Sequence, residues 1–550
     1  MTGGYELGAV DSPVDWAAYG LTRHEPRRML ANAPRTIPEI VSMGAAAWPD
    51  REALVGRFGR YTYSAFAEAV DCAVCALQAL GLQRGDRIAA TSANHTDIVI
   101  AFFAAQRLGA VWVGVNRNLA GPEKRFMLED SGSSLYLADR DSAAQVAEAG
   151  KLENLRAVVD MEPGDPASEW AQRLYAHAGA RPDAKPVDPY APAAIAYTSG
   201  TTGFPKGAVH SQHNLVVVGA MGRAHGLSMG LERAGVTLPV TILNLMTLGP
   251  ITAFMAGRTS VMMDRIDAVG VAEWVKAEKV ETFAAAPTMV YDLLSNPAVK
   301  PEDLDSLKAP GAGGAAVPEA LRDLYRARFG RELTSSYGMT EAPTSVTFVD
   351  PTEPLIAASC GKACMHLRLA IQDADGREMP VGESGEICVA GATEGEFAGL
   401  YTPMLGYWRR PEATEEALRG GWYHTGDMGR LDAAGNLYVE GRRNDVILRG
   451  GANVYPAEIE RVLHMDARVN ACAVVGKPDE RLGELVVAFV QAAPQAGSLE
   501  VLEADLRALC QRELARYKVP AAWIFTDEMP RNAMNKVVKA ELKRRFFTEV

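Results

Sequence analysis

The sequence predicts an α/β protein whose last fifth forms a separate, smaller α+β unit. Three observations indicate this class. Helical patterns alternate with short β-branched runs through the first 190 residues, and the pattern changes to short strands and glycine-containing turns from about Gly361. The charge also changes, because residues 442–550 contain 17 Lys and Arg against 15 Asp and Glu, whereas the whole chain has a net charge of −12.

The first elements follow a strand–helix–strand order that is typical of a mainly parallel sheet. Helix 97–108, which ends at Gly109, lies between two of the predicted strands. The strands predicted in this part are 87–90, 111–115, 135–138, 194–197, 261–263 and 282–285. We interpret the uncharged stretch 240–257 as a buried core segment, because Asn244 and Gly249-Pro250 interrupt it as a membrane span.

The remaining elements divide into two groups. Turns at 373–376 and 432–436 predict a β-rich subdomain over about 361–441, which completes a large N-terminal domain over 1–441. The C-terminal domain is expected over 442–550. Its predicted elements are helix 456–464, strands 471–475 and 485–490, and helix 499–514.

The composition excludes several classes of protein. With 550 residues and 48% hydrophobic residues, the chain can fill three or four folding units and is not disordered. Its acidic charge excludes a dedicated nucleic-acid binder. The acidic N-terminal segment lacks the basic and then apolar layout of a signal peptide. We therefore expect a cytoplasmic protein without stable membrane insertion.

One cysteine pair and one histidine pair are close enough in the sequence to be considered as metal ligands. Seven cysteines, an odd count, do not predict a disulfide framework. Cys72 and Cys75 have the spacing of a metal or redox pair, but they lie in an apolar helical pattern that ends at Gly81, so we interpret them as core residues. His210 and His213 have no acidic neighbour to complete a site, and we expect capping or packing roles for them.

Segment 197–207 (YTSGTTGFPKG) is the most informative part of the sequence. Its three glycines and four Ser and Thr residues allow the backbone to turn N–H groups toward an anion, and Lys206 adds a positive charge. The spacing differs from that of a P-loop, because no Gly-Lys-[Ser/Thr] follows to begin a helix. The segment therefore predicts a phosphate-binding loop of another kind.

This loop resembles the signature loop of the adenylate-forming superfamily, which includes acyl-CoA synthetases, aryl-CoA ligases and related adenylation enzymes. Other segments resemble landmarks of that family in the same order along nearly the whole chain: 335–341 (SSYGMTE), 385–391 (GEICVAG), 406–408 (GYW), 422–427 (WYHTGD), 441–460, 517–520 (YKVP) and 530–536 (PRNAMNK). The resemblance implies an α/β fold. Its large N-terminal domain would contain two α/β sheet subdomains plus a β-rich subdomain, and its small α+β C-terminal domain would be a mobile lid.

The resemblance also implies an ATP-dependent acid–CoA ligase. Such an enzyme joins a carboxylate to AMP with release of pyrophosphate, and then transfers the acyl group to coenzyme A. The resemblance assigns Lys536 as the cation at the α-phosphate, and Glu341, with Thr340 beside it, as the carboxylate for Mg²⁺. The residues that it implies for ATP and AMP are Thr198, Ser199, Gly200, Thr201, Thr202, Gly203, Lys206, Gly313, Gly314, Ala315, Ser336, Tyr337, Gly338, Met339, Thr340, Asp427 and Arg442.

The same resemblance gives the lid a hinge and an acceptor loop. The hinge position is Asn444, where Asp or Lys is usual, and the loop for coenzyme A contains Gly450 and Gly451. Asn tolerates unusual backbone angles, so hinging is retained in this interpretation. A second departure is Asn535, which precedes the lysine where the family typically has Gly.

The predicted acid is apolar and of medium size or larger: aromatic, alicyclic or branched. Thr241, Ile242, Gly311 and Gly313 are the residues implied for its pocket. No Asp lies between Leu238 and Leu248 to anchor an α-amino group, which argues against amino acids.

Two other functions stay open at this stage. The acyl group could pass to an amine or to a carrier-protein thiol in place of coenzyme A, and a non-catalytic nucleotide-binding descendant is a further alternative. A homodimer also stays open.

Overall fold

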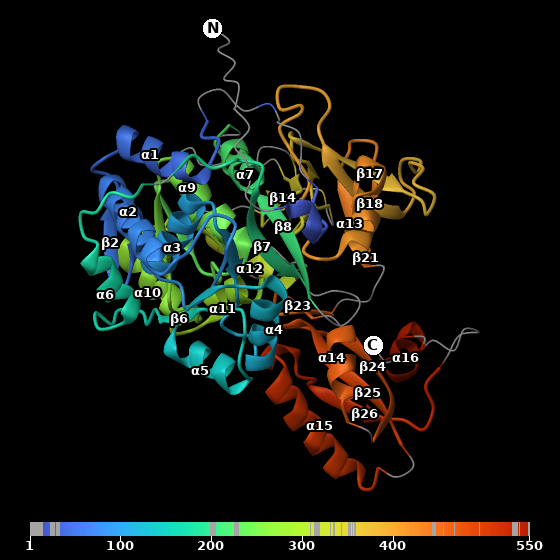
Figure 1. The fold of residues 1–550 in the computed structure, drawn as a ribbon. Helices are drawn as coiled ribbons and strands as arrows, with labels where there is room; N and C mark the ends of the chain where they lie inside the picture. Colours follow the sequence, from blue (N-terminus) through green and yellow to red (C-terminus); the bar gives the residue numbers. More distant parts are fainter. Residues whose placement is uncertain are drawn as a thin grey trace.

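The chain is described by a computed structural model (Figure 1). The described residues are 15–22, 28, 33–183, 185–198, 205–224, 230–285, 287–308, 310–312, 319–330, 332–333, 336–342, 344–349, 354, 356, 359–442, 447–454, 456–466, 468–493, 496–530, 537 and 539–547.

A seven-stranded sheet forms the first α/β subdomain, with the order β19-β8-β7-β4-β3-β5-β6. From β7 to β6 the neighbours are parallel, and β8 and β19 extend the sheet in antiparallel fashion. Its strands are β3 (Arg87–Thr91), β4 (Val111–Gly114), β5 (Leu135–Ala138), β6 (Ala157–Asp160), β7 (Pro192–Thr198), β8 (Lys206–Ser211) and β19 (Gly406–Tyr407). Its helices are α3 (Thr96–Leu108), α4 (Gly121–Ser131), α5 (Arg140–Glu148), α6 (Glu169–Ala176) and α7 (Gln212–Ala224).

A six-stranded sheet forms the second α/β subdomain, with the order β12-β11-β9-β10-β1-β2. Its strands are β1 (Glu52–Gly56), β2 (Gly59–Thr62), β9 (Arg233–Val236), β10 (Thr259–Met262), β11 (Thr282–Ala285) and β12 (Gly311–Ala312). Its helices are α1 (Ile37–Ala47), α2 (Tyr63–Ala79), α8 (Leu243–Met246), α9 (Thr252–Met255), α10 (Ala268–Glu278), α11 (Pro287–Ser295) and α12 (Glu319–Phe329). One hydrophobic core joins both sheets, because Leu54 and Ile88 belong to the same buried cluster as Phe66, Phe103 and Phe254 from helices.

The β-rich subdomain is built on an antiparallel sheet with the order β17-β18-β20-β21. Its strands are β17 (Leu367–Gln372), β18 (Gly385–Gly391), β20 (Tyr423–Leu431) and β21 (Leu437–Arg442), and short pairs precede it: β13 (Gly338–Met339) with β14 (Thr344–Ser345), and β15 (Thr347–Phe348) with β16 (Lys362–Ala363). Helix α13 (Pro411–Ala417) lies before β20. Asp427 and Arg442 are opposite each other in the β20–β21 pair.

The C-terminal domain, which we call the lid, contains its own sheet below the large domain in Figure 1. Its strands are β22 (Ile447–Arg449), β23 (Ala452–Val454), β24 (Val469–Asp479), β25 (Gly483–Ala492) and β26 (Ala522–Phe525). Its helices are α14 (Pro456–Leu463), α15 (Leu499–Glu513) and α16 (Lys539–Phe547). Apolar side chains alternate along β24 and β25, so α14 and α15 cover one face of the sheet and α16 the other.

The predicted α/β class, the two sheet subdomains, the β-rich subdomain and the small α+β domain are confirmed. Helix 97–108 is confirmed as α3, which ends at a left-handed Gly109. The predicted strand 471–475 is too short, because β24 continues to Asp479 as it pairs with β25 along its whole length. The division at 441/442 stays a prediction, and β21 runs one residue past it.

The stretch 240–257 folds as α8, a π-helical turn over Thr247–Ile251, and α9. Met246, Ile251 and Phe254 are buried in the core, as predicted for this stretch. Among the described residues, no helix is both long and apolar enough to cross a membrane. All seven cysteines are free thiols.

Candidate active site

Strands β7 and β8 hold the two ends of the predicted phosphate-binding loop. Thr198 ends β7, Lys206 begins β8, and the two residues are paired across the sheet. The chain therefore leaves and re-enters the sheet at one edge, as a loop that folds back on a ligand requires. Behind it, the Tyr197 hydroxyl donates a hydrogen bond to Asp130 Oδ2 at 2.8 Å and anchors the end of β7.

Glu341 lies beside this sheet edge. The Thr198 hydroxyl donates to Glu341 Oε1 at 3.0 Å, and the Tyr407 hydroxyl donates to the same oxygen at 3.1 Å. Lys206 Nζ lies 5.3 Å from the centroid of the Tyr407 ring, within the range of a cation–π contact. Three segments that are far apart in the sequence thus meet at one carboxylate.

Tyr407 was missed as a site residue by the sequence analysis. Its segment, 406–408, was noted only as a family landmark, and nothing in a strand of two residues indicates which side chain faces the carboxylate. The structure shows why the aromatic residue stands there: the ring contacts Lys206 and its hydroxyl reaches Glu341.

The buried His210 side chain contacts the backbone of Thr340, the residue before Glu341. Its Nε2 lies 2.9 Å from the Thr340 carbonyl oxygen, which can only accept, so Nε2 carries the proton and Nδ1 accepts from the Asn214 amide at 3.0 Å. Burial lowers the pKa of His210 to about 4, so the ring is neutral near pH 7. His213 Nε2 lies 2.7 Å from the Leu400 carbonyl oxygen. The expected packing roles are confirmed for both residues. His210 contacts the backbone of Thr340, which directly precedes Glu341.

A second carboxylate, Asp427, faces Tyr337. The Tyr337 hydroxyl donates to Asp427 Oδ2 at 2.6 Å, and Asp427 is buried. Arg442 is opposite Asp427 in the adjacent strand, although its side chain lies outside the described atoms. The Tyr337 backbone N–H donates to the Thr347 hydroxyl at 2.8 Å. Of the neighbouring predicted residues, Ser336 and Gly338 are exposed and Met339 is half-buried.

The turn before Asp427 is held by Glu386. Its Oε1 accepts from the Gly426 backbone N–H at 3.0 Å, and its Oε2 lies 3.1 Å from His424 Nδ1. Cys388 Sγ lies 3.3 Å from the same ring nitrogen. Among the described residues these three form the only group with the geometry of a metal site. Because Arg419 also pairs with Glu386 at 3.2 Å, we interpret the group as a support for the Asp427 turn.

Of the residues predicted for the acyl pocket, Thr241 and Ile242 lie between β9 and α8, and Gly311 begins β12. Thr241 is buried, whereas Ile242 and Leu248 are 38% and 40% exposed and give this wall an apolar surface. The Asn94 side chain fixes the segment, because it donates to the Leu238 carbonyl at 2.9 Å and accepts from the Val240 N–H at 3.0 Å. Among the described atoms, an added Cβ at Gly311 would meet only the Phe283 carbonyl oxygen, at the van der Waals distance of 3.6 Å.

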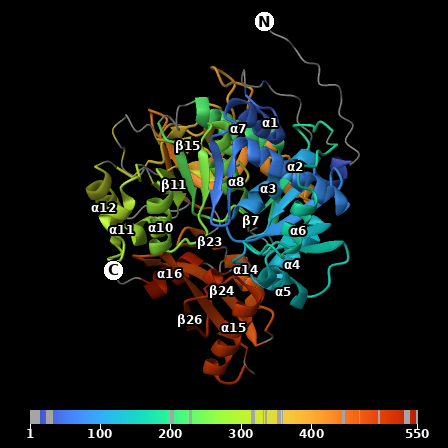
Figure 2. The same ribbon diagram turned by 90° about the vertical axis from the view of Figure 1, so that its left-hand side faces the viewer.

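The predicted acceptor loop forms the tip of the β22–β23 hairpin. Gly450 and Gly451 have φ angles of 58° and 80°, which favour glycine. Arg449 Nη1 donates to the Tyr517 carbonyl at 2.7 Å and ties the hairpin to the segment before β26. In both ribbon views β23 lies on the side of the lid that faces the large domain (Figures 1 and 2).

Several predicted residues lie outside the described part of the chain. They are Ser199, Gly200, Thr201, Thr202, Gly203, Gly313, Gly314, Ala315, Asn444 and Lys536. The described part brings together Thr198, Lys206, Tyr337, Thr340, Glu341 and Asp427 within one large domain.

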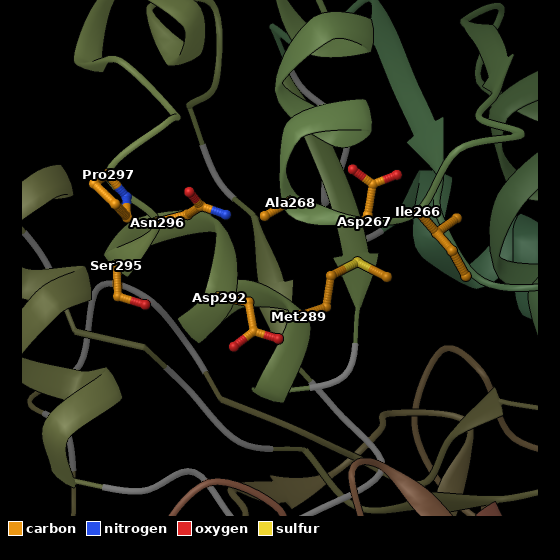
Figure 3. A pocket seen from close by; sticks show the side chains of 8 residues that line it. All are labelled: Ile266, Asp267, Ala268, Met289, Asp292, Ser295, Asn296 and Pro297. Atoms are coloured by element: carbon orange, nitrogen blue, oxygen red, sulfur yellow. The ribbon is translucent and has the colours of Figure 1, made fainter.

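A cavity of about 540 Å³ lies elsewhere, between the start of α10 and the end of α11 (Figure 3). It is lined by Ile266, Asp267, Ala268, Met289, Asp292, Ser295, Asn296 and Pro297. None of these residues belongs to a predicted motif, and Asp267 accepts from the Gly270 N–H as the cap of α10. This cavity is therefore not part of the candidate active site.

Comparison with known proteins adds independent findings. The family model described as AMP-binding enzyme matches residues 42–408, and the model described as AMP-binding enzyme C-terminal domain matches residues 458–536. A feruloyl-CoA synthase from Amycolatopsis sp is 35% identical over 92% of this chain and 99% of its own.

Two solved structures are also similar. The amide bond synthetase McbA from Marinactinospora thermotolerans is 28% identical with a TM-score of 0.79, covering 93% of this chain and 99% of its own. An o-succinylbenzoate CoA synthetase (MenE) double mutant from Bacillus subtilis, bound with its product analogue OSB-NCoA, is 27% identical with a TM-score of 0.77, covering 92% of this chain and 98% of its own.

Proposed function

The chain belongs to the AMP-binding enzyme family, and from this premise we propose that it joins an apolar carboxylic acid of medium size or larger to coenzyme A. It is an AMP-forming acid–thiol ligase, as its adenylate-forming sequence segments imply. The observation that carries the proposal is the meeting of Thr198, Tyr407 and Glu341 beside Lys206. These contacts support the proposal because they bring an anionic oxygen and a cation to the two ends of the predicted phosphate-binding loop.

The first half-reaction activates the acid. The substrate carboxylate attacks the α-phosphate of ATP, pyrophosphate leaves, and an acyl-adenylate forms. We assign the loop from Thr198 to Lys206 to the phosphates, Asp427 and Arg442 to the ribose, and Tyr337 to the border of the adenine site. Lys536 from the lid would stabilise the negative charge that develops at the α-phosphate. The partly buried Tyr337–Asp427 hydrogen bond supports this assignment because it holds a carboxylate ready to accept from two hydroxyls.

The donor set at Glu341 fits Mg²⁺. A carboxylate and the Thr198 hydroxyl are oxygen ligands, which Mg²⁺ prefers, and both described hydrogen bonds to Glu341 end on Oε1. When bound, Mg²⁺ would neutralise charge on the phosphate oxygens. The chain's own part is to hold Glu341 in place, through Thr198, Tyr407 and the Thr340–His210 contact.

The second half-reaction transfers the acyl group. The thiol of coenzyme A attacks the acyl carbonyl, the thioester forms, and AMP leaves. We propose that the lid rotates about Asn444 between the two steps, so that the hairpin with Gly450 and Gly451 replaces Lys536 at the site. The hairpin supports this role because it faces the large domain (Figure 1) and because Arg449 connects it by a hydrogen bond to the rest of the lid.

The residues proposed to form the acyl pocket support the acid class. Exposed Ile242 and Leu248 give an apolar surface, and Gly311 has no side chain to take up the room that a ring or a branch would need. No carboxylate lies between Leu238 and Leu248 to pair with an amino group. The feruloyl-CoA synthase and o-succinylbenzoate CoA synthetase relatives are named for aromatic acids, which supports the aromatic choice.

The second candidate function keeps the adenylation and changes the acceptor to an amine. The similarity to an amide bond synthetase favours it. Coenzyme A is preferred, because the tip of the hairpin is Gly450-Gly451, which leaves its backbone open to a narrow pantetheine arm.

The test is a substrate panel. Pyrophosphate release is measured with ATP, Mg²⁺ and aromatic, alicyclic, branched and short-chain acids and amino acids, followed by coenzyme A or an amine. We expect turnover with apolar acids and a coenzyme A thioester as the product. Turnover of only acetate or amino acids would refute the acid class, and an amide without a thioester would refute the acceptor.

A further inference from the structure

A buried ion cluster joins the lid to the large domain. Lys518 Nζ lies 2.6 Å from Glu123 Oε1 and 2.8 Å from Glu458 Oε1. The Glu123, Lys518 and Glu458 side chains are 7%, 6% and 4% exposed. Lys518 and Glu458 belong to the lid, whereas Glu123 belongs to α4 of the large domain, which also packs against α15. Both ribbon views place α4 next to the lid (Figures 1 and 2).

Both carboxylates are fixed in place. Glu123 lies in the first turn of α4, and its Oε2 accepts from the Ala120 N–H at 2.8 Å. Glu458 lies in the first turn of α14. Helix N-termini stabilise negative charge. Burial raises the pKa of Glu458 to about 7, and the positive charge of Lys518 opposes that rise, so the Glu458 carboxylate depends on its contact with Lys518. A buried charge that loses its partner is strongly unfavourable, and this makes the contact specific for one orientation of the lid.

Lys518 is mechanically tied to the acceptor hairpin. Arg449, at the end of β22, donates to the Tyr517 carbonyl at 2.7 Å and to the Val519 carbonyl at 3.2 Å, on both sides of Lys518. The Gly450 N–H donates to the Leu482 carbonyl at 2.8 Å. Fixing Lys518 against the large domain therefore also fixes the hairpin.

The hairpin and Val537, which directly follows Lys536 in the sequence, pack on opposite faces of the lid sheet. Ile447 and Val454 from the hairpin belong to the cluster under α14 and α15. Val537, which follows Lys536, packs with Leu542 of α16 on the other face. If the lid rotated so that its other face turned toward the candidate active site, Lys518 would move away from Glu123. Lys518 and Glu458 would stay together, because both belong to the lid.

We propose that Glu123 is a positioning residue for the thiol-transfer step, which it serves by holding the lid through Lys518 in the orientation that presents the Gly450-Gly451 hairpin. This inference rests on the proposed function, in which the lid alternates between two half-reactions. Glu123 touches no reacting atom, and the adenylation step does not need the contact.

The substitution Glu123→Gln tests the proposal. Glutamine can still accept from the Ala120 N–H, but it removes the charge that faces Lys518. With preformed acyl-adenylate and coenzyme A, we expect the single-turnover rate of thioester formation to fall about tenfold. The rate of pyrophosphate release from ATP and the acid should stay within about twofold of wild type.

The matched control is Glu129→Gln on the same helix, because Glu129 is 56% exposed and pairs only at the surface with Arg125. It should change neither rate. An equal loss of both half-reactions in Glu123→Gln, or no loss in either, would overturn the proposal.

A measurement without substrates separates this inference from the proposed function. Hydrogen exchange of the backbone amides at 516–519 should become faster in Glu123→Gln than in wild type and in Glu129→Gln. If wild type formed no thioester, the proposed function would fail, while faster exchange would still show that Glu123 docks the lid. Unchanged exchange would contradict the docking role itself.

Discussion

The large domain and the lid hold their predicted functional residues in different ways. In the large domain, hydrogen bonds join segments that are distant in sequence: Thr198 and Tyr407 contact Glu341, and Tyr337 contacts Asp427. In the lid, the acceptor hairpin is a local structure, and its placement depends on a buried lysine that meets a carboxylate of the other domain. The residues proposed to bind the nucleotide are therefore arranged within the large domain alone. The position of the acceptor hairpin depends on how the lid is oriented relative to the large domain.

The largest effect should come from Lys536→Ala in the lid. Loss of this cation should lower acyl-adenylate formation by about 10²–10³-fold, because charge developing at the α-phosphate loses its stabilisation. Thioester formation from supplied acyl-adenylate should be largely retained. Both rates are measured by single-turnover mass spectrometry. An equal loss of both rates would contradict a role of Lys536 in adenylation alone.

The next largest effect is expected from Asp427→Asn in the large domain. Asparagine can still accept from the Tyr337 hydroxyl, but the charge that would accept from the ribose is lost. A charge-assisted hydrogen bond contributes about 1.5–3 kcal/mol, so the KM for ATP should rise at least about tenfold. Asp375→Asn, in an exposed turn, is the control. An unchanged KM would exclude Asp427 from the nucleotide site.

A smaller effect is expected from Tyr407→Phe, which tests whether the hydroxyl of Tyr407 positions Glu341 in the large domain. The ring under Lys206 remains, whereas the hydroxyl that donates to Glu341 is lost. A charge-assisted hydrogen bond contributes about 1.5–3 kcal/mol. Because Thr198 still donates to the same oxygen, we expect the lower end of this range, so adenylation should slow about tenfold. Tyr438→Phe, whose hydroxyl contacts Asp432, is the control and should leave the rate unchanged. Thioester formation from supplied adenylate that fell as much as adenylation would contradict the assignment.

The smallest effect concerns pH and His210. Its pKa is about 4 in the folded chain against about 6.5 when unfolded, so its contribution to stability is complete above pH 6.5 and is lost as pH falls toward 4. The slope of that loss is at most about 1.4 kcal/mol per pH unit. His210→Gln can still donate to the Thr340 carbonyl but does not titrate. Thermal unfolding midpoints of the variant and wild type should diverge in slope between pH 6.5 and 4, and parallel profiles would contradict a neutral buried ring.

Much of the fold could be predicted because local sequence determines it. Strand 135–138 and strand 282–285 coincide with β5 and β11, and Gly109 ends α3 in the left-handed conformation that glycine allows. The end of β24 was missed, because its length depends on pairing with β25 and not on its own residues.

The site could be predicted only where a contiguous motif carries it. Thr198, Lys206, Glu341 and Asp427 stand in such motifs. Tyr407 and Glu123 act through partners that are 66 and 395 residues away, and no local pattern indicates such a contact. His210 was correctly expected to pack, but its partner, the carbonyl before Glu341, depends on tertiary structure.

The central claim is that the large domain activates the acid as an adenylate before the lid presents the acceptor. It is tested most directly with an apolar aromatic acid labelled with ¹⁸O in both carboxylate oxygens, turned over with ATP, Mg²⁺ and coenzyme A. Attack of the carboxylate on the α-phosphate predicts that AMP carries one labelled oxygen and that pyrophosphate carries none. Unlabelled AMP, or ADP with labelled inorganic phosphate, would contradict the account.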